Sequence, residues 1–160
     1  LGLVGSEMCI RDSNNGEDPV RNFVTLNPNC RLFLHEFWAN YQYKHEFNPP
    51  HWHGGLYSFV IWMKIPYSWE EQTKLPQFQT TKIQDRKAGM FEFEYSDTRG
   101  ETRSLSYQLS PDFEGCMCFF PAWMRHAVYP FFGTDEERVS ISGNIWYTPG
   151  TSAGKGFGSK

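Results

Sequence analysis

Residues 56–66, LYSFVIWMKIP, decide the fold class of this chain. The stretch is rich in apolar and aromatic residues, and its only proline comes last, so nothing interrupts an extended backbone. Successive side chains of a strand point to opposite faces. One face would hold Tyr57, Phe59, Ile61, Met63 and Ile65, and the other Ser58, Val60, Trp62 and Lys64. We expect a strand from about Leu56 to Ile65.

Other strands are expected before and after this one. Residues 31–44, RLFLHEFWANYQYK, are dense in aromatic and aliphatic side chains and end before the break Asn48-Pro49-Pro50. Later candidates are residues 90–95, a hairpin partner containing Leu105, Tyr107 and Leu109, and residues 115–120, 126–129 and 138–147. About eight short strands with almost no helix predict an all-β sandwich or barrel.

Residues 66–87 interrupt this series of strands. They are mostly polar, show no regular period and contain one short helix candidate at residues 67–72. We expect them to form an insertion over the mouth of the barrel, where a lid would lie.

The composition limits the classes of function. The net charge is -3 and the 15 Lys and Arg are scattered, so the sequence lacks the basic stripe typical of nucleic-acid-binding proteins. It also lacks the apolar run of about 18 residues that a membrane helix needs. Of four cysteines, Cys116 and Cys118 would point to opposite faces of one strand, which disfavours a disulfide framework. We expect a reduced, cytoplasmic protein.

The chain is expected to hold one domain between two segments that do not belong to it. Residues 1–13, LGLVGSEMCIRDS, resemble translated adapter sequence at the ends of assembled metagenome reads, so they are excluded from the fold. Residues 14–149 are expected to form the domain. Residues 150–160 are rich in Gly and Ser and are expected to be a flexible tail.

The first candidate for chemistry is the pair His51 and His53. Side chains at i and i+2 of an extended segment share a face, so both imidazoles could bind one metal ion. If the extended conformation continued through Gly54-Gly55, they would share the face of Tyr57 and point into the barrel. The alternative is two exposed loop histidines.

The second candidate is the segment FFPAWMRHAVYP followed by the strand that begins at Arg138. His126 can supply a third ligand from a distant strand. Arg138 lies in an otherwise apolar and small-residue strand, and a buried arginine needs an anionic partner. The carboxylate of a ligand would be that partner, with Ser140 on the same face adding a hydrogen bond. The alternative is a solvated charge that continues the acidic run at residues 135–137.

These stretches resemble the iron- and 2-oxoglutarate-dependent dioxygenase superfamily, and specifically its phage and bacterial group of 2OG-Fe(II) oxygenases. The matching segments are residues 47–66 (FNPPHWHGGLYSFVIWMKIP) and 115–147 (GCMCFFPAWMRHAVYPFFGTDEERVSISGNIWY). The resemblance implies a double-stranded β-helix, that is, a cupin-like jelly roll. It implies Fe(II) at His51, His53 and His126, and 2-oxoglutarate at Arg138 and Ser140.

The resemblance extends to two further residues and to the reaction. Asn40 precedes His51 by eleven residues, which is similar to the asparagine of alkylation-repair dioxygenases that touches 2-oxoglutarate. Tyr57 would add a hydroxyl to the cosubstrate, its alternative being a core aromatic. The reaction implied is hydroxylation of a small molecule or an amino-acid side chain by dioxygen, with release of succinate and CO2.

One departure from the superfamily concerns His53, which stands where most members carry Asp or Glu. A neutral imidazole there leaves Fe(II) one negative charge short, and Glu46 is a neighbouring acid that could serve instead. Two other readings therefore stay open. One is a cupin-type three-histidine metalloenzyme without 2-oxoglutarate, and the other is a non-enzymatic jelly-roll binding module.

Overall fold

The structure is a computed structural model, and it describes residues 31–79 and 86–148. The expected adapter segment at residues 1–13, the tail at 150–160 and residues 80–85 of the insertion lie outside the described residues. The strands are β1 (Arg31–Gln42), β2 (Asn48–His51), β3 (Tyr57–Lys64), β4 (Phe91–Ser96), β5 (Thr102–Tyr107), β6 (Met117–Pro121), β7 (Arg125–Val128) and β8 (Arg138–Thr148). The helices are α3 (Trp69–Lys74), α4 (Pro76–Gln79) and a 3-10 turn, η2 (Pro111–Phe113).

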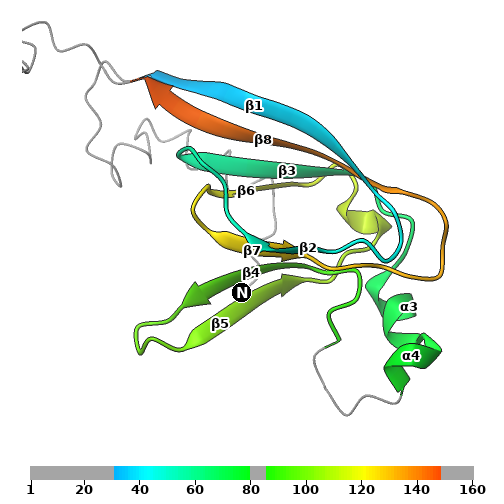
Figure 1. The fold of residues 1–160 in the computed structure, drawn as a ribbon. Coiled ribbons are helices and arrows are strands. Elements are labelled where there is room, and N and C mark those ends of the chain that lie inside the picture. Colours follow the sequence, from blue (N-terminus) through cyan, green and yellow to red (C-terminus); the bar gives the residue numbers. More distant parts are fainter. Residues whose placement is uncertain (1–30, 80–85, 149–160) are drawn as a thin grey trace, which may run out of the picture.

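The strands form two four-stranded antiparallel sheets that face each other (Figure 1). One sheet has the order β1-β8-β3-β6 and the other the order β2-β7-β4-β5. Neighbouring strands thus come from distant parts of the chain, as β1 and β8 do. The expected all-β, double-stranded β-helix is confirmed.

The strand β2 was not expected, because Asn48-Pro49-Pro50 looked like a break. Proline has no N–H to donate to a ladder, so it is confined to positions where a strand needs no partner on that side. The strand β2 is such a place, because among the described strands it forms the edge of its sheet and pairs with β7 alone.

The interior face of β3 is the opposite of the one expected. Ser58, Val60 and Trp62 are buried, whereas Tyr57 and Phe59 lie on the outer face. The reason is the bend at Gly55, whose φ of +105° ends the extended conformation between His53 and β3. A Cβ on Gly55 would lie 2.8 Å from the Trp146 ring. Both the positive φ and this close contact therefore require glycine at position 55.

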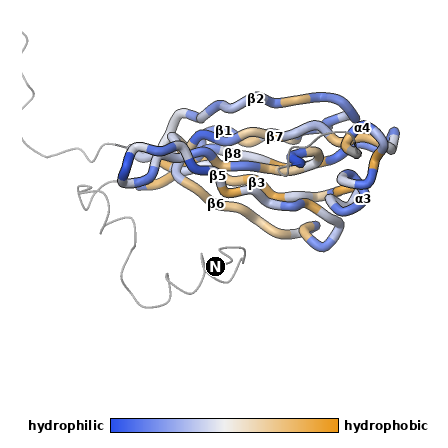
Figure 2. The backbone as a smooth tube through the Cα atoms, turned by 90° about the horizontal axis from the view of Figure 1, so that it is seen from below, coloured by the Kyte–Doolittle hydropathy of each residue, from blue (hydrophilic) through white to orange (hydrophobic). Residues whose placement is uncertain are grey.

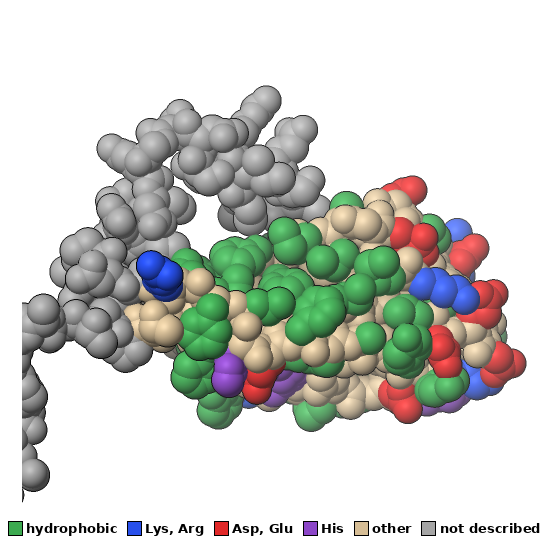
Figure 3. Space-filling model, turned by 90° about the horizontal axis from the view of Figure 1, so that it is seen from above, with side chains coloured by type: hydrophobic (Ala, Val, Ile, Leu, Met, Phe, Trp, Pro, Cys, Tyr) green, Lys and Arg blue, Asp and Glu red, His purple; other side chains and the backbone are tan. Residues whose placement is uncertain are grey.

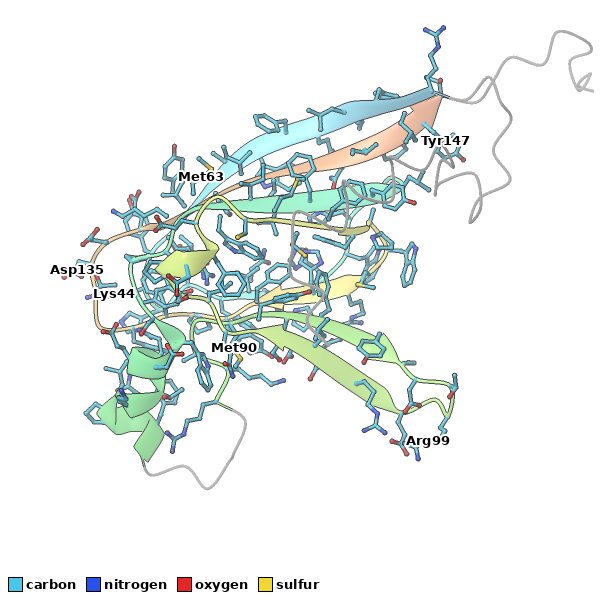
Figure 4. All side chains as sticks on the ribbon, turned by 180° about the vertical axis from the view of Figure 1, so that it is seen from behind. Lys44, Met63, Met90, Arg99, Asp135 and Tyr147 are labelled. Carbon is cyan, nitrogen blue, oxygen red and sulfur yellow. The ribbon has the colours of Figure 1, made fainter. Side chains whose placement is uncertain are left out.

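The core fills the space between the two sheets (Figure 4). It consists largely of aromatic side chains, which meet edge to face, as the rings of Phe93 and Phe120 do at 4.9 Å. Its buried members are Val60, Trp62, Ile65, Tyr67, Phe91, Phe93, Tyr107, Leu109, Phe120 and Phe131. Hydrophobic residues run along β3 and β6 in Figure 2.

The outer face of the β1-β8-β3-β6 sheet is also apolar. Phe37, Gly143, Phe59 and Phe119 form one row across the four strands, and Ala39, Ile141, Ile61 and Met117 form the next. Figure 3 shows hydrophobic side chains over the middle of the molecule and charged ones gathered at one end. Lys44 and Asp135 meet at that end, 2.5 Å apart.

The described helices of the insertion contact the segment between β7 and β8 and do not line the cavity. Ser68 begins α3 with a capping box, in which its Oγ accepts from the Glu71 N–H and the Glu71 carboxylate accepts from the Ser68 N–H. Buried Gln72 then joins the helix to Phe132, donating to its carbonyl at 2.9 Å and accepting from its N–H at 2.7 Å. The predicted helix at residues 67–72 is therefore present, two residues later than expected.

Candidate active site

The strands β1 and β8 invert the usual polarity of a sheet with one solvent-facing side. Apart from Trp38, their apolar side chains face outward, and most of their polar side chains face the space between the sheets. The inward polar residues pair across the two strands, as Asn40 does with Ser140 and Gln42 with Arg138. Such a polar inner face would be costly to bury against a dry core, so it marks a cavity.

This cavity has a volume of about 620 Å³ and lies between the two sheets. Its wall includes the aromatic residues Trp38, Phe47, Trp62, Phe91 and Phe120. Its exposed lining comes from β1 and residues 46–48, so it opens between the two edge strands β1 and β2. A cavity of this size accommodates small organic molecules.

Three histidines meet on one wall of the cavity. The register of the β2–β7 ladder sets His51 opposite His126, and His53 follows two residues after His51. Their ring centroids are 4.3 to 5.1 Å apart, and one ligand nitrogen of each lies within 4.8 Å of the other two. No other such cluster of histidine, cysteine or carboxylate ligands occurs within residues 31–79 and 86–148.

Backbone carbonyls orient two of the three rings. The Nδ1 atom of His126 is 3.0 Å from the Met124 carbonyl, and that of His51 is 2.7 Å from the Pro49 carbonyl. In each case the neutral ring donates from Nδ1, so Nε2 keeps its lone pair for a metal ion. Outer partners of this kind are typical of metal-ligating histidines.

Burial favours the neutral, ligating form of His53 and His126. Burial lowers the pKa of His126 to about 4, opposed by the Met124 carbonyl. Burial also lowers the pKa of His53, assisted by His51 and opposed by Glu36. Three imidazoles this close fit a divalent transition metal ion such as Fe(II), which accepts nitrogen ligands.

Arg138 lies in the same cavity and is only 3% exposed. It donates hydrogen bonds to Gln42 Oε1, to the Tyr67 hydroxyl and, at 3.3 Å, to the Tyr129 carbonyl. Burial lowers the pKa of Arg138, and Tyr67 opposes this effect, but a guanidinium stays charged in proteins. No carboxylate of the described residues pairs with it, so the cavity contains a fixed positive charge.

The structure brings together some of the cosubstrate residues expected from the sequence. Ser140 and Asn40 line the cavity, and the Asn40 amide donates to Ser142 Oγ at 3.3 Å and to Ser140 Oγ at 3.5 Å. Tyr57 does not reach the cavity, contrary to expectation, and stacks on Phe119 on the outer face with ring centroids 4.8 Å apart. The bend at Gly55 explains this, as above. Glu46 also lines the cavity but is not part of the histidine cluster.

Sequence reasoning missed two residues that hold Arg138. Tyr67 and Gln42 both accept from its guanidinium, and Tyr67 in turn donates to the Gly89 carbonyl at 2.8 Å. The sequence could have indicated Gln42, because it lies two residues after Asn40 on the same face of a strand. No sequence pattern indicated Tyr67. It begins the insertion where a lid was expected, yet the described part of that segment lines none of the cavity.

No helix among the described residues has the length and apolar character to span a membrane.

Comparison with known protein families identifies one that matches most of the described chain. The model of the family described as "Putative 2OG-Fe(II) oxygenase" matches residues 36–144, a range that contains the three histidines and Arg138. Comparison with curated proteins finds no match.

Proposed function

The chain belongs to the 2OG-Fe(II) oxygenase family, and from this premise we propose that it is a dioxygenase that hydroxylates a C–H bond of its substrate. His51, His53 and His126 would hold Fe(II), and Arg138 would bind the distal carboxylate of 2-oxoglutarate. Bound Fe(II) supplies the oxidative chemistry that converts 2-oxoglutarate and dioxygen into succinate, CO2 and a hydroxylated product.

The observation that carries the proposal is the buried positive charge of Arg138 in the same cavity as the histidine cluster. An isolated buried cation is strongly unfavourable, and its neutral partners Gln42 and Tyr67 orient the guanidinium without cancelling its charge. The hydrogen bonds to described residues use three of its five N–H groups, which leaves two for a carboxylate. A dicarboxylate with one end on the metal and one on Arg138 satisfies both features.

Other residues of the cavity prepare it for this ligand. Ser140 follows Arg138 on the inward face of β8 and can donate its hydroxyl proton to the same carboxylate. Asn40 holds that hydroxyl from the neighbouring strand. The aromatic wall formed by Trp62, Phe91 and Phe120 excludes water from the interior end, which strengthens the attraction between charges there.

One observation favours a second candidate function. The histidine cluster contains no carboxylate, as in cupin-type three-histidine enzymes that use no 2-oxoglutarate. Both functions predict metal binding, but only the first requires Arg138.

The test is succinate release from 2-oxoglutarate after anaerobic loading with Fe(II). We expect wild-type protein to release succinate and Arg138→Leu to release none while it still binds one metal ion. Arg103→Leu, which removes an exposed arginine of the β4–β5 hairpin, is the matched control and should behave as wild type. Succinate release that survives Arg138→Leu would overturn the cosubstrate assignment. Metal-dependent chemistry unaffected by 2-oxoglutarate would favour the three-histidine alternative.

A further inference from the structure

His53 differs from the other two histidines in its hydrogen bonds. His51 and His126 have backbone carbonyls as outer partners, whereas the His53 ring forms no hydrogen bond with the described residues. A ligating histidine almost always gives its second N–H to a carboxylate, a carbonyl or water. His53 therefore needs an outer partner if it binds metal.

The carboxylate nearest to this role belongs to Glu36 on β1. A register shift between Leu34 and Glu36 turns Glu36 toward the interior, on the face of Trp38 and Asn40. The ring of Trp38, two residues along that face, lies 5.6 Å from the ring of His53. Glu36 itself is exposed and lies outside the cavity lining, next to the end of the cavity where Trp38 contacts His53.

A buried polar pair holds the Glu36 carboxylate in place. The Asn144 amide donates to Glu36 Oε2, and the Ser58 hydroxyl donates to Asn144 Oδ1 at 2.6 Å. Asn144 is 2% exposed and Ser58 is 1% exposed. Burying two polar side chains is favourable only when they are hydrogen-bonded, and here each bond directs the next toward the carboxylate.

The charge of Glu36 is available to His53. No lysine or arginine among the described residues forms an ion pair with Glu36. Its negative charge is therefore not cancelled by a cation of the described residues.

We propose that Glu36 is the outer partner of the metal site, its carboxylate accepting the ring N–H of His53 while the other nitrogen of His53 binds the metal. This inference rests on the proposed function, since it needs a metal at the three histidines. It also accounts for the negative charge that the metal site lacks because His53 stands where most members of the superfamily carry Asp or Glu. Glu36 supplies, from β1 and through His53, the negative charge that a carboxylate ligand would have supplied directly. Glu36 is thus a positioning residue.

The test measures Co(II) affinity by absorbance titration without 2-oxoglutarate. We expect Glu36→Gln to weaken Co(II) binding about 10- to 100-fold, because glutamine keeps the shape but not the charge. Glu101→Gln, an exposed carboxylate on the distant β4–β5 hairpin, is the control and should leave the affinity unchanged. Equal affinities of wild type and Glu36→Gln would overturn the role of Glu36 alone. Failure of wild type to bind Co(II) would overturn the metal site and the proposed function with it.

A double-mutant cycle with His53→Ala separates action through His53 from other effects. If Glu36 acts through this ring, Glu36→Gln should cause no further loss in the His53→Ala background. An equal loss in both backgrounds would overturn the proposal, because Glu36 would then act as a ligand or through the fold. Metal-free thermal unfolding of each variant identifies a general loss of structure, and Glu36→Asp, which keeps the charge, should restore part of the affinity.

Discussion

The guanidinium of Arg138 donates to the hydroxyl oxygen of Tyr67, a residue 71 positions earlier in the chain. Tyr67 uses its own proton to bond the Gly89 carbonyl at 2.8 Å, so it has one orientation and presents its lone pair to Arg138. Its ring also stacks on Phe131, with centroids 4.8 Å apart. This chain of contacts sets the direction in which the only buried cation of the described cavity points.

Tyr67→Phe should raise the KM for 2-oxoglutarate about tenfold or more, with a smaller effect on kcat. The substitution leaves a buried guanidinium N–H without its acceptor, and hydrogen bonds to charged groups contribute about 1.5 to 3 kcal/mol. Steady-state assays of succinate release measure this. Tyr57→Phe removes a hydroxyl from the outer face and should change neither constant; a raised KM in that variant would return Tyr57 to the site.

Gly89→Ala should lower stability more than Gly100→Ala. Both glycines have positive φ, +71° and +79°, so alanine is strained at each. A Cβ on Gly89 would lie 2.6 Å from the Tyr67 ring, whereas a Cβ on Gly100 would meet nothing within 4 Å. The contact should add about 1 to 3 kcal/mol of destabilisation, measured by urea unfolding.

Equal losses of stability in Gly89→Ala and Gly100→Ala would show that the Tyr67 ring moves aside at no energetic cost. Gly89→Ala should also weaken 2-oxoglutarate binding, since it displaces the acceptor of Arg138.

Replacing single histidines by alanine should separate the five histidines of the chain into two groups. His51→Ala, His53→Ala and His126→Ala should each reduce the binding of Fe(II), because each removes one of three ligands. His35→Ala and His45→Ala are matched controls, since neither residue belongs to the cluster, and both should bind one ion. Metal analysis after anaerobic loading measures the stoichiometry. Full binding by His53→Ala would show that this residue is not a ligand.

Acid should destabilise the protein partly through Glu92, which has no exposed surface. Burial alone would raise its pKa, but hydrogen bonds from Lys87 at 2.8 Å, Ser106 at 2.6 Å and Tyr129 at 3.2 Å outweigh burial and lower it. The unfolded chain therefore takes up this proton first, near its ordinary pKa of about 4.3. The stabilisation from Glu92 is present above that pH and is lost as the pH falls through the folded value.

Glu92→Gln should therefore flatten the dependence of unfolding free energy on pH below about 4.3 and lower stability at pH 7 by about 1 to 3 kcal/mol. Urea unfolding across this range measures both effects. Glu101→Gln, in an exposed ion pair with Arg103, should change the profile little. An unchanged acid slope in Glu92→Gln would contradict the lowered pKa.

Much of the fold could be predicted because short runs of apolar and aromatic residues, free of internal glycine and proline, indicate strands. The expected strands at residues 31–44, 56–65 and 138–147 match β1, β3 and β8 within a few residues. The missing strand β2 shows the limit of such reasoning. Its prolines are acceptable only because β2 is an edge, and an edge is a property of the whole sheet.

The candidate site also has a part that local spacing predicts and a part that depends on strand pairing. His51 and His53 could be placed on one face from their spacing, because a two-residue repeat depends only on local backbone conformation. The third member, His126, could be named but not positioned, since its approach to His51 depends on a ladder between residues 75 positions apart.

The sequence by itself determined the all-β class, the three histidines and the arginine strand, because these depend on residue type and short-range spacing. Only the tertiary structure decided which face of β3 is interior, since the bend at Gly55 reverses the face expected for that strand. It also decided the partners of Arg138 and the hydrogen bond between Asn144 and Glu36. Those relationships join side chains from different strands, and strand register, not sequence spacing, sets the distance between them.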